Sequence, residues 1–220
     1  MLDAFAGKGV ARSYEHAPGA VLMERLTPGT PLSELSLWGQ DDEATHVLAD
    51  VMSRMSAGEL PRTAPTVEQW GRAFQRVSPP ASMGGDLLSE ARDVFDDLCR
   101  SQTNRRLLHG DLHHYNILHD RERGWLAIDP KGVVGELEYE IGAALRNPVE
   151  RPELFVDPAA IEKRITHFAS TLAIDAVRTL RWAFAQAVLA ALWSVEEGGN
   201  VDARHPFIRL AEAIQPMLVS

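Results

Sequence analysis

A polar segment at residues 107–120, LLHGDLHHYNILHD, constrains the fold of this chain more than any other feature. It contains four of the eight histidines, two aspartates and one asparagine. The runs ILH and WLAID follow Asn116 on either side of DRERG, a pattern that predicts two short strands joined by a turn. Asp111 then lies on a loop, Asn116 at the start of one strand and Asp129 at the end of the other. We expect these three side chains to converge at one end of a β hairpin.

The three residue types suit divalent-cation chemistry at a hydroxyl group. Hard cations such as Mg²⁺ take oxygen ligands, a carboxylate and a carboxamide among them, and leave positions for substrate phosphates. A carboxylate outside the metal shell can orient or deprotonate a hydroxyl nucleophile. Taken singly, Asp111, Asn116 and Asp129 fit turn or capping roles. Their joint spacing instead indicates a site of phosphoryl transfer.

The rest of the sequence predicts an α+β protein dominated by helices. Residues 9–15 and 20–26 are β-rich on either side of HAPG, which predicts a hairpin, and TPGTP at 27–31 breaks the pattern. Residues 41–58 begin with acidic residues, carry an apolar stripe and place Gly58 just past the expected helix end. Apolar periodicity and stop signals predict further helices at 67–77, 86–102, 159–173, 176–197 and 206–218.

Composition and charge narrow the classes of function. A net charge of −9 argues against binding along a nucleic-acid backbone and favours a cationic or polar small molecule as partner. Cys99 is the only cysteine in the sequence, so neither an internal disulfide nor a thiol-rich zinc site can form. The first thirty residues lack a signal-peptide pattern, and the longest apolar run, near 183–193, is too short to span a membrane. We expect a soluble protein of the cytoplasm.

The string HGDLHHYNIL, with WLAIDPKGVVGELEYEIGAALRNP after it and LMERLTPGTPL before it, resembles the aminoglycoside phosphotransferase family. The chain is similar over nearly its whole length to the aminoglycoside/hydroxyurea kinase branch, the streptomycin 6-phosphotransferase-like enzymes. The resemblance implies a protein-kinase-like fold. Residues 1–26 would be part of the N-terminal lobe, a two-stranded remnant, and residues 27–220 a mostly helical C-terminal lobe with a catalytic β hairpin. It also implies an ATP-dependent kinase that phosphorylates and inactivates an aminoglycoside-like antibiotic of the streptomycin or hydroxyurea type.

Positions within the family pattern imply roles for individual residues. Asp111 would be the catalytic base, and Asn116 and Asp129 would bind the Mg²⁺ that accompanies ATP. His109 would order the loop by hydrogen bonding. Glu140 would support the loop from a position where the wider family usually has an aspartate. The hinge between the lobes, where backbone contacts adenine, would comprise Met23, Glu24, Arg25 and Leu26.

Several other polar residues have two readings. Four carboxylates are candidates for an acidic acceptor pocket or else are solvated surface charges: Glu136, Glu138, Glu196 and Glu197. Lys131 follows the metal motif and either meets a phosphate or is an ordinary surface lysine. His114 and His119 are expected to be partly exposed.

The parts of a kinase that should precede the hinge do not fit this sequence. Only three lysines are present, Lys8, Lys131 and Lys163, and Lys8 in AGKGV lacks the spacing of a Walker A motif. No helix fits between Lys8 and the hinge. We therefore expect the strand lysine, its helix glutamate and the phosphate-covering loop to lie before Met1, which would leave this chain weakly active.

Two other classes of function remain open from the sequence. One is a non-catalytic remnant that binds a cationic ligand or another protein. The other is a metal hydrolase, because His109 and His113 have the i,i+4 spacing of a zinc pair. Against the hydrolase, Gly110 occupies the position where a zinc-hydrolase motif has glutamate, and the local pattern is loop and strand rather than helix.

Overall fold

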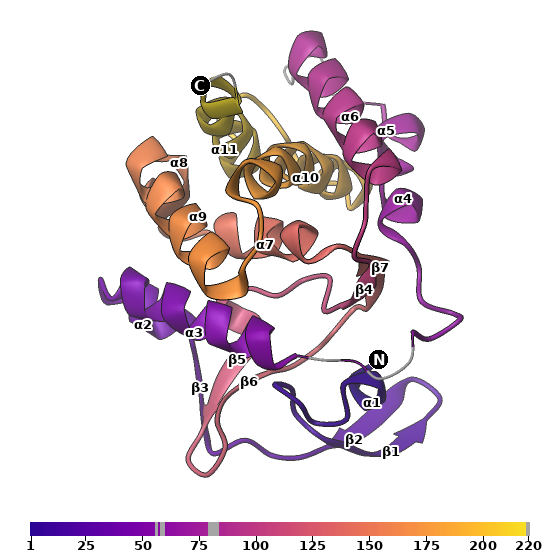
Figure 1. The fold of residues 1–220 in the computed structure, drawn as a ribbon, viewed down its shortest axis with the longest axis vertical. Coiled ribbons are helices and arrows are strands. Elements are labelled where there is room, and N and C mark those ends of the chain that lie inside the picture. Colours follow the sequence, from indigo (N-terminus) through magenta and orange to yellow (C-terminus); the bar gives the residue numbers. More distant parts are fainter. Residues whose placement is uncertain (56, 58–59, 79–83, 219–220) are drawn as a thin grey trace.

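The computed structural model describes residues 1–55, 57, 60–78 and 84–218. Gly58, the expected end of the first long helix, lies outside the described residues. The strands of the N-terminal part and the catalytic hairpin lie at one end of the molecule, and most of the helices lie at the other (Figure 1). The α+β arrangement predicted from the sequence is therefore confirmed.

Two small sheets make up the β end of the molecule. β1 (Ser13–Ala17) and β2 (Ala20–Met23) form the predicted N-terminal hairpin, and its strands are shorter than expected. β3 (Pro28–Pro31), β5 (Ile117–Asp120) and β6 (Gly124–Ala127) form an antiparallel sheet in the order β3-β5-β6. TPGTP, predicted as a break, thus supplies an edge strand. The amide of Ala11 donates to the carbonyl of Ala127 at 2.8 Å, which ties the N-terminal segment to the catalytic hairpin.

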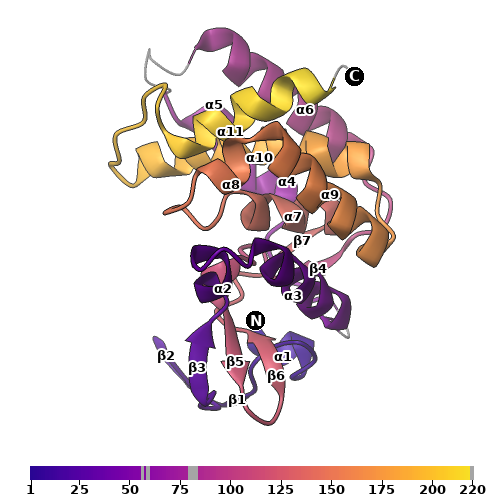
Figure 2. The ribbon, with the colours of Figure 1, turned by 90° about the vertical axis from the view of Figure 1, so that its left-hand side faces the viewer.

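A third small sheet, short 3₁₀ turns and the helices form the remaining structure. The third sheet is two-stranded and pairs β4 (Arg106–Leu108) with β7 (Val133–Gly135). The segments η2 (His114–Asn116) and η3 (Gln215–Leu218) are 3₁₀ turns. The helices are α1 (Leu2–Phe5), α2 (Ser33–Leu37), α3 (Asp41–Arg54), α4 (Val67–Trp70), α5 (Ala73–Arg76), α6 (Gly85–Arg100), α7 (Leu137–Leu145), α8 (Glu153–Val156), α9 (Pro158–Leu172), α10 (Ala176–Glu196) and α11 (Pro206–Ile214). In Figure 2, α2 and α3 lie between the β3-β5-β6 sheet and the helices α4 to α11, whereas α1 lies at the β end of the molecule.

The C-terminal helices begin and end close to the predicted residues. The side chain of Asp157 accepts from the amide of Ala160 at 3.3 Å and caps the N-terminus of α9. The side chain of Asp175 accepts from the backbone amide of Arg178 at 2.8 Å and caps the N-terminus of α10. Gly198 has a φ of 81° just after α10, as expected of a glycine that ends a helix. Among the residues that the structure describes, no helix has both the length and the apolar character of a membrane span.

Two predictions about the helices are corrected by the structure. The helix expected at 67–77 is two short turns, α4 and α5, on either side of Gly71. Gly71 has helical backbone angles, and a Cβ atom there would lie 2.1 Å from a ring carbon of Phe95, so the chain passes close to α6 at the junction of the two turns. α7 was not predicted at all, because seven of its nine residues are buried and no apolar stripe remains to mark it.

The long helix α10 occupies the centre of the helical part. It packs against α6, α7, α9 and α11. Its Trp182 is fully buried, with ring centroids 5.4 Å from Phe95 of α6 and 5.2 Å from Tyr139 of α7. This packing fixes α7, which supports the loop that carries Asp111.

Candidate active site

The loop that carries Asp111 requires a glycine immediately before it. Gly110 has a φ of +86°, a conformation that side chains rarely adopt. A Cβ atom there would lie 2.6 Å from Cη2 of Trp70 and 3.1 Å from a methyl group of Val133. The backbone at the catalytic loop therefore packs directly on the indole of Trp70.

Glu140, on α7, accepts hydrogen bonds from the loop that carries Asp111. Its carboxylate is buried, with 3% of the residue exposed, and accepts the amide of Gly110 at 3.0 and 3.2 Å and the amide of Leu112 at 3.3 Å. Burial raises the pKa of Glu140 to about 7, while these amide donors favour the ionised form and act in the opposite direction. The backbone on both sides of Asp111 is thus attached to α7.

His109 joins the same loop to the end of β6. Its Nε2 lies 2.8 Å from the carbonyl oxygen of Ile128, and its Nδ1 accepts from the amide of Asp111 at 3.3 Å. Both bonds form only when the proton is on Nε2. Burial lowers the pKa of His109 to about 4, so the ring is neutral near pH 7. Since both nitrogens bond within the fold, His109 has none left for a zinc ion.

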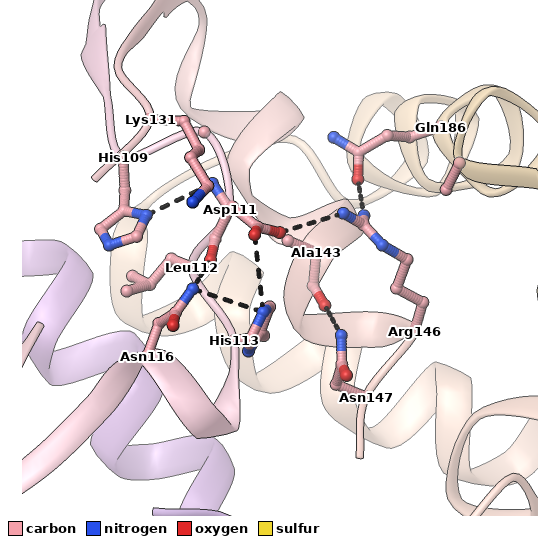
Figure 3. A network of polar contacts seen from close by, with 12 residues as sticks. His109, Asp111, Leu112, His113, Asn116, Lys131, Ala143, Arg146, Asn147 and Gln186 are labelled. Atoms are coloured by element: carbon pink, nitrogen blue, oxygen red, sulfur yellow. Dashed lines mark hydrogen bonds and ion pairs between the residues drawn. The ribbon is translucent and has the colours of Figure 1, made fainter. Parts of the chain in front are cut away.

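The carboxylate of Asp111 lies between two nitrogen-bearing side chains (Figure 3). Nη2 of Arg146 is 3.3 Å from Oδ1, and Nε2 of His113 is 3.6 Å from Oδ2. Arg146 is buried and donates its other terminal nitrogen to Oε1 of Gln186. Burial alone would raise the pKa of Asp111, but His113 and Arg146 outweigh it and lower the pKa to about 2. Asp111 is therefore ionised and held in orientation at neutral pH.

A hydrogen bond from its side-chain amide orients Asn116. Its Nδ2 donates to the carbonyl oxygen of Asp111 at 2.9 Å, so Oδ1 remains as the acceptor end of the side chain. The amide of Ile128 donates to the carbonyl of Asn116 at 2.9 Å. The register of the hairpin, with Ile117 opposite Ala127, thus brings Asn116 beside the residue that precedes Asp129, as the sequence predicts.

Asp129 presents an accessible carboxylate at this end of the hairpin. It has a φ of 56°, and its side chain is 63% exposed and pairs with Nζ of Lys131 at 2.6 Å. An accessible carboxylate and a carboxamide oxygen fit Mg²⁺, which needs few protein ligands when phosphates supply the others. In the described ranges no three histidine, cysteine or acidic side chains are grouped to hold a metal ion. The donors therefore fit a metal shared with a phosphate better than a zinc site made by protein alone.

A cavity of about 390 Å³ opens beside Asp111. It lies between the catalytic loop, the α4–α5 segment and the end of α10. The residues that line it are Gln69, Trp70, Arg76, Gly110, Asp111, Lys131, Arg146 and Trp193.

The four glutamates considered for an acceptor pocket occupy different environments. Glu136 is 2% exposed, and its carboxylate accepts from Arg178 and from the indole of Trp182, so we remove it from the acceptor candidates. Glu196 is at the end of α10 and pairs with Arg76, a cavity residue, at 2.6 and 2.9 Å. Glu138 is half-buried and Glu197 exposed, and neither lines the cavity.

The predicted hinge begins at Met23, the last residue of β2. Glu24 accepts the amide of Arg12 at 2.7 Å and pairs with Arg123, so its carboxylate is engaged within the β end. Leu26 is buried in a small cluster with Ala11 and Leu126. Met23 is half-buried and Arg25 exposed. A contact of this segment with adenine stays a prediction.

The predicted partial exposure of His114 and His119 is wrong for His114. His119 is half-buried, close to what the sequence predicts. His114 is fully buried, and neither ring nitrogen has a hydrogen-bond partner among the described residues. The reason is that η2 turns this ring away from solvent into the protein, whereas a polar loop residue would ordinarily face water.

Sequence reasoning missed four residues of the site. Trp70 ends α4, Arg146 follows α7, and Gln186 and Trp193 both lie on α10, so these residues meet only in the folded chain. The sequence signal for Arg146 is a basic residue in AALRNP, six positions after Glu140. Nothing local marked Gln186 or the two tryptophans.

Comparison with known proteins shows the family of this chain. Residues 1–198 match the model of a family described as aminoglycoside/hydroxyurea antibiotic resistance kinase. The chain is 34% identical to streptomycin 3''-kinase of Klebsiella pneumoniae over 90% of its own length and 75% of that protein. It is 27% identical to streptomycin 6-kinase of Streptomyces glaucescens, over 90% of this chain and 66% of the relative. It is also 27% identical to hydroxyurea phosphotransferase of Kitasatospora aureofaciens, over 90% and 58%.

Solved structures show the same fold at low sequence identity. The apo form of a thermostable mutant of aminoglycoside phosphotransferase APH(4)-Ia has a TM-score of 0.66 at 16% identity, over 99% of this chain and 82% of that one. Choline kinase LicA from Streptococcus pneumoniae has a TM-score of 0.65 at 14% identity, over 100% and 78%. The protein-kinase-like fold expected from the sequence is thus confirmed, and the chain belongs to the aminoglycoside/hydroxyurea antibiotic resistance kinase family.

Proposed function

We propose that this protein is an ATP- and Mg²⁺-dependent kinase of the cytoplasm. It transfers the γ-phosphoryl group of ATP to a hydroxyl of an aminoglycoside-like antibiotic, of the streptomycin or hydroxyurea type, and so inactivates it. The observation that carries the proposal is the position of Asp111. Its ionised carboxylate lines the cavity, and its main-chain carbonyl accepts a hydrogen bond from Nδ2 of Asn116, which lies at the hairpin end that bears Asp129.

Each residue has a stated task in this reaction. Asp111 accepts the proton of the acceptor hydroxyl as that oxygen bonds to the γ-phosphorus and the bond from phosphorus to the β-phosphate oxygen breaks, releasing ADP. Oδ1 of Asn116 and the carboxylate of Asp129 would hold the Mg²⁺, whose charge offsets that of the phosphates. Lys131 pairs with Asp129 and would meet a phosphate if Asp129 held the metal. Backbone at residues 23–26 would contact the adenine.

Calorimetric titration with Mg·ATP tests the nucleotide half of the proposal. We expect wild-type chain to bind and Asp129→Asn to lose most of that affinity. Asp50→Asn is a matched control, because its side chain is 64% exposed, close to the 63% of Asp129, and it lies on α3 away from the cavity. Equal affinity of all three proteins for Mg·ATP would refute the metal assignment.

Coupled measurement of ADP release tests the transfer step. Streptomycin and hydroxyurea are the acceptors to supply first, since proteins acting on them are relatives of this chain. Asp111→Asn should abolish ADP release that depends on acceptor and leave Mg·ATP binding in place. Retained turnover in Asp111→Asn would exclude it as the base. Drug binding that is indifferent to ATP would favour the non-catalytic remnant instead.

A further inference from the structure

Two tryptophans line the cavity beside Asp111 and take no part in the chemistry proposed above. Trp70 ends α4 and Trp193 lies near the end of α10. Their ring centroids are 5.8 Å apart and the ring planes meet at 88°. Both are half-buried, so part of each indole faces the cavity and part packs on the core. The two rings therefore form a corner of the cavity wall.

Trp70 is fixed in direct contact with the catalytic loop. Gly110 leaves no room between its backbone and this indole, because a Cβ atom there would lie 2.6 Å from Cη2. The ring centroid of Trp70 is also 6.4 Å from that of Tyr139, a buried residue of α7. An acceptor lying on this indole would be next to Asp111.

The charged groups of the cavity are already paired. Arg76 binds both oxygens of Glu196, Arg146 binds Asp111, and Lys131 binds Asp129. Among the residues that line the cavity, Asp111 is the one carboxylate. A cationic acceptor thus finds few unpaired carboxylates here, whereas the indoles offer rigid apolar surface. Removing a charge from water without a partner is costly, and aromatic burial is favourable.

We infer that Trp70 and Trp193 form the acceptor platform of this enzyme. A hydroxylated ring, such as a sugar or a cyclitol, lies with its apolar face against the indoles and directs a hydroxyl toward Asp111. Specificity then comes from the fit of a ring against the corner rather than from pairing of amino groups with carboxylates. The inference rests on the proposed function, because it takes this cavity as the acceptor site.

Binding of two probes separates the platform from the rest of the site. Streptomycin contains saturated hydroxylated rings, and hydroxyurea contains none. Each is titrated by calorimetry, with and without Mg²⁺ and a non-hydrolysable ATP analogue. Trp193→Leu should weaken streptomycin about tenfold, which corresponds to about 1.4 kcal/mol, and Trp193→Phe should restore most of that loss. The affinity for hydroxyurea should change by less than about twofold, because it has little surface to stack.

Two controls define a loss that is specific to the platform. Trp38→Leu removes a tryptophan that is 81% exposed and does not line the cavity, and it should bind streptomycin as wild type does. Nucleotide affinity should be the same in all of these proteins.

Three outcomes would overturn the inference. The first is unchanged streptomycin affinity in Trp193→Leu. The second is loss of streptomycin binding in Glu196→Gln together with its retention in Trp193→Leu, which would make charge the determinant. The third is a wild-type chain that binds nucleotide but not streptomycin, which leaves the kinase proposal standing. Failure of the kinase proposal gives a different result, because Mg²⁺ and the ATP analogue then do not bind. Binding of streptomycin to the indoles is still measured in the titration without nucleotide.

Discussion

The buried imidazole of His114 should make the stability of this protein depend on pH. The ring is fully buried, and neither nitrogen has a hydrogen-bond partner among the described residues. Burial, followed by the nearby charge of Arg164, lowers the pKa of His114 to about 3, from 6.5 in an unfolded chain. Replacing it by leucine, which has a similar volume and no polar atoms, removes this titration.

The sign and size of the effect follow from proton linkage. Because the native pKa of His114 lies below its unfolded value, between pH 6.5 and 3 the ring is protonated in the unfolded chain and neutral in the native protein. Stability from this group is complete above pH 6.5 and is lost as pH falls. At about 1.36 kcal/mol per pH unit, lowering the pH from 7.5 to 5 removes about 2 kcal/mol. His109, whose pKa is lowered to about 4, adds a loss in the same direction, so only a difference between proteins isolates His114.

Urea unfolding followed by tryptophan fluorescence measures this difference. Wild type and His114→Leu are compared at several pH values from 7.5 to 5. At pH 7.5 the variant should be at least as stable, because an unsatisfied buried polar group costs about 1–3 kcal/mol. Its advantage should grow by about 2 kcal/mol by pH 5. His119→Leu controls for removal of a histidine from the neighbouring strand. Parallel stability curves for wild type and His114→Leu would refute the reasoning, because they would mean that the native ring takes up its proton normally.

Three further substitutions test other contacts. Gly110→Ala should lower the free energy of unfolding by about 2–4 kcal/mol and abolish transfer, because it combines a positive φ with a clash against the Trp70 ring, and wild-type stability in urea would contradict this. Arg164→Met should lower the free energy of unfolding by about 3–5 kcal/mol, because it leaves the Asp41 carboxylate without its buried partner. The double variant with Asp41→Leu should recover most of that loss, and a double variant that does not recover it would contradict the reasoning. Arg146→Gln should move the acidic limb of the kcat/KM profile to higher pH, because a cation that lowers the pKa of Asp111 is removed, and an unmoved limb would contradict this.

Local signals in the sequence were enough to place much of the structure. The β5–β6 hairpin needs only its own turn, and α9 and α10 lie close to the predicted ranges 159–173 and 176–197. The closeness of Asn116 to the residue before Asp129 follows from that hairpin alone. What could not be predicted depends on distant partners. β4 and β7 have three residues each and pair with one another, and α7 is buried on nearly all sides, so neither a strand nor a helix period is visible.

The acidic composition does not locate the groups that bind the acceptor, for a physical reason. A net charge of −9 counts carboxylates without showing which of them are free. Glu136 is used inside the fold by Arg178 and Trp182, and Glu196 is used by Arg76 at the cavity edge. Each carboxylate bound in this way has part of its attraction for an outside cation already satisfied, and releasing it would cost the partner its own ion pair. Recognition at such a wall falls to groups with unsatisfied surface, and beside Asp111 those groups are indoles.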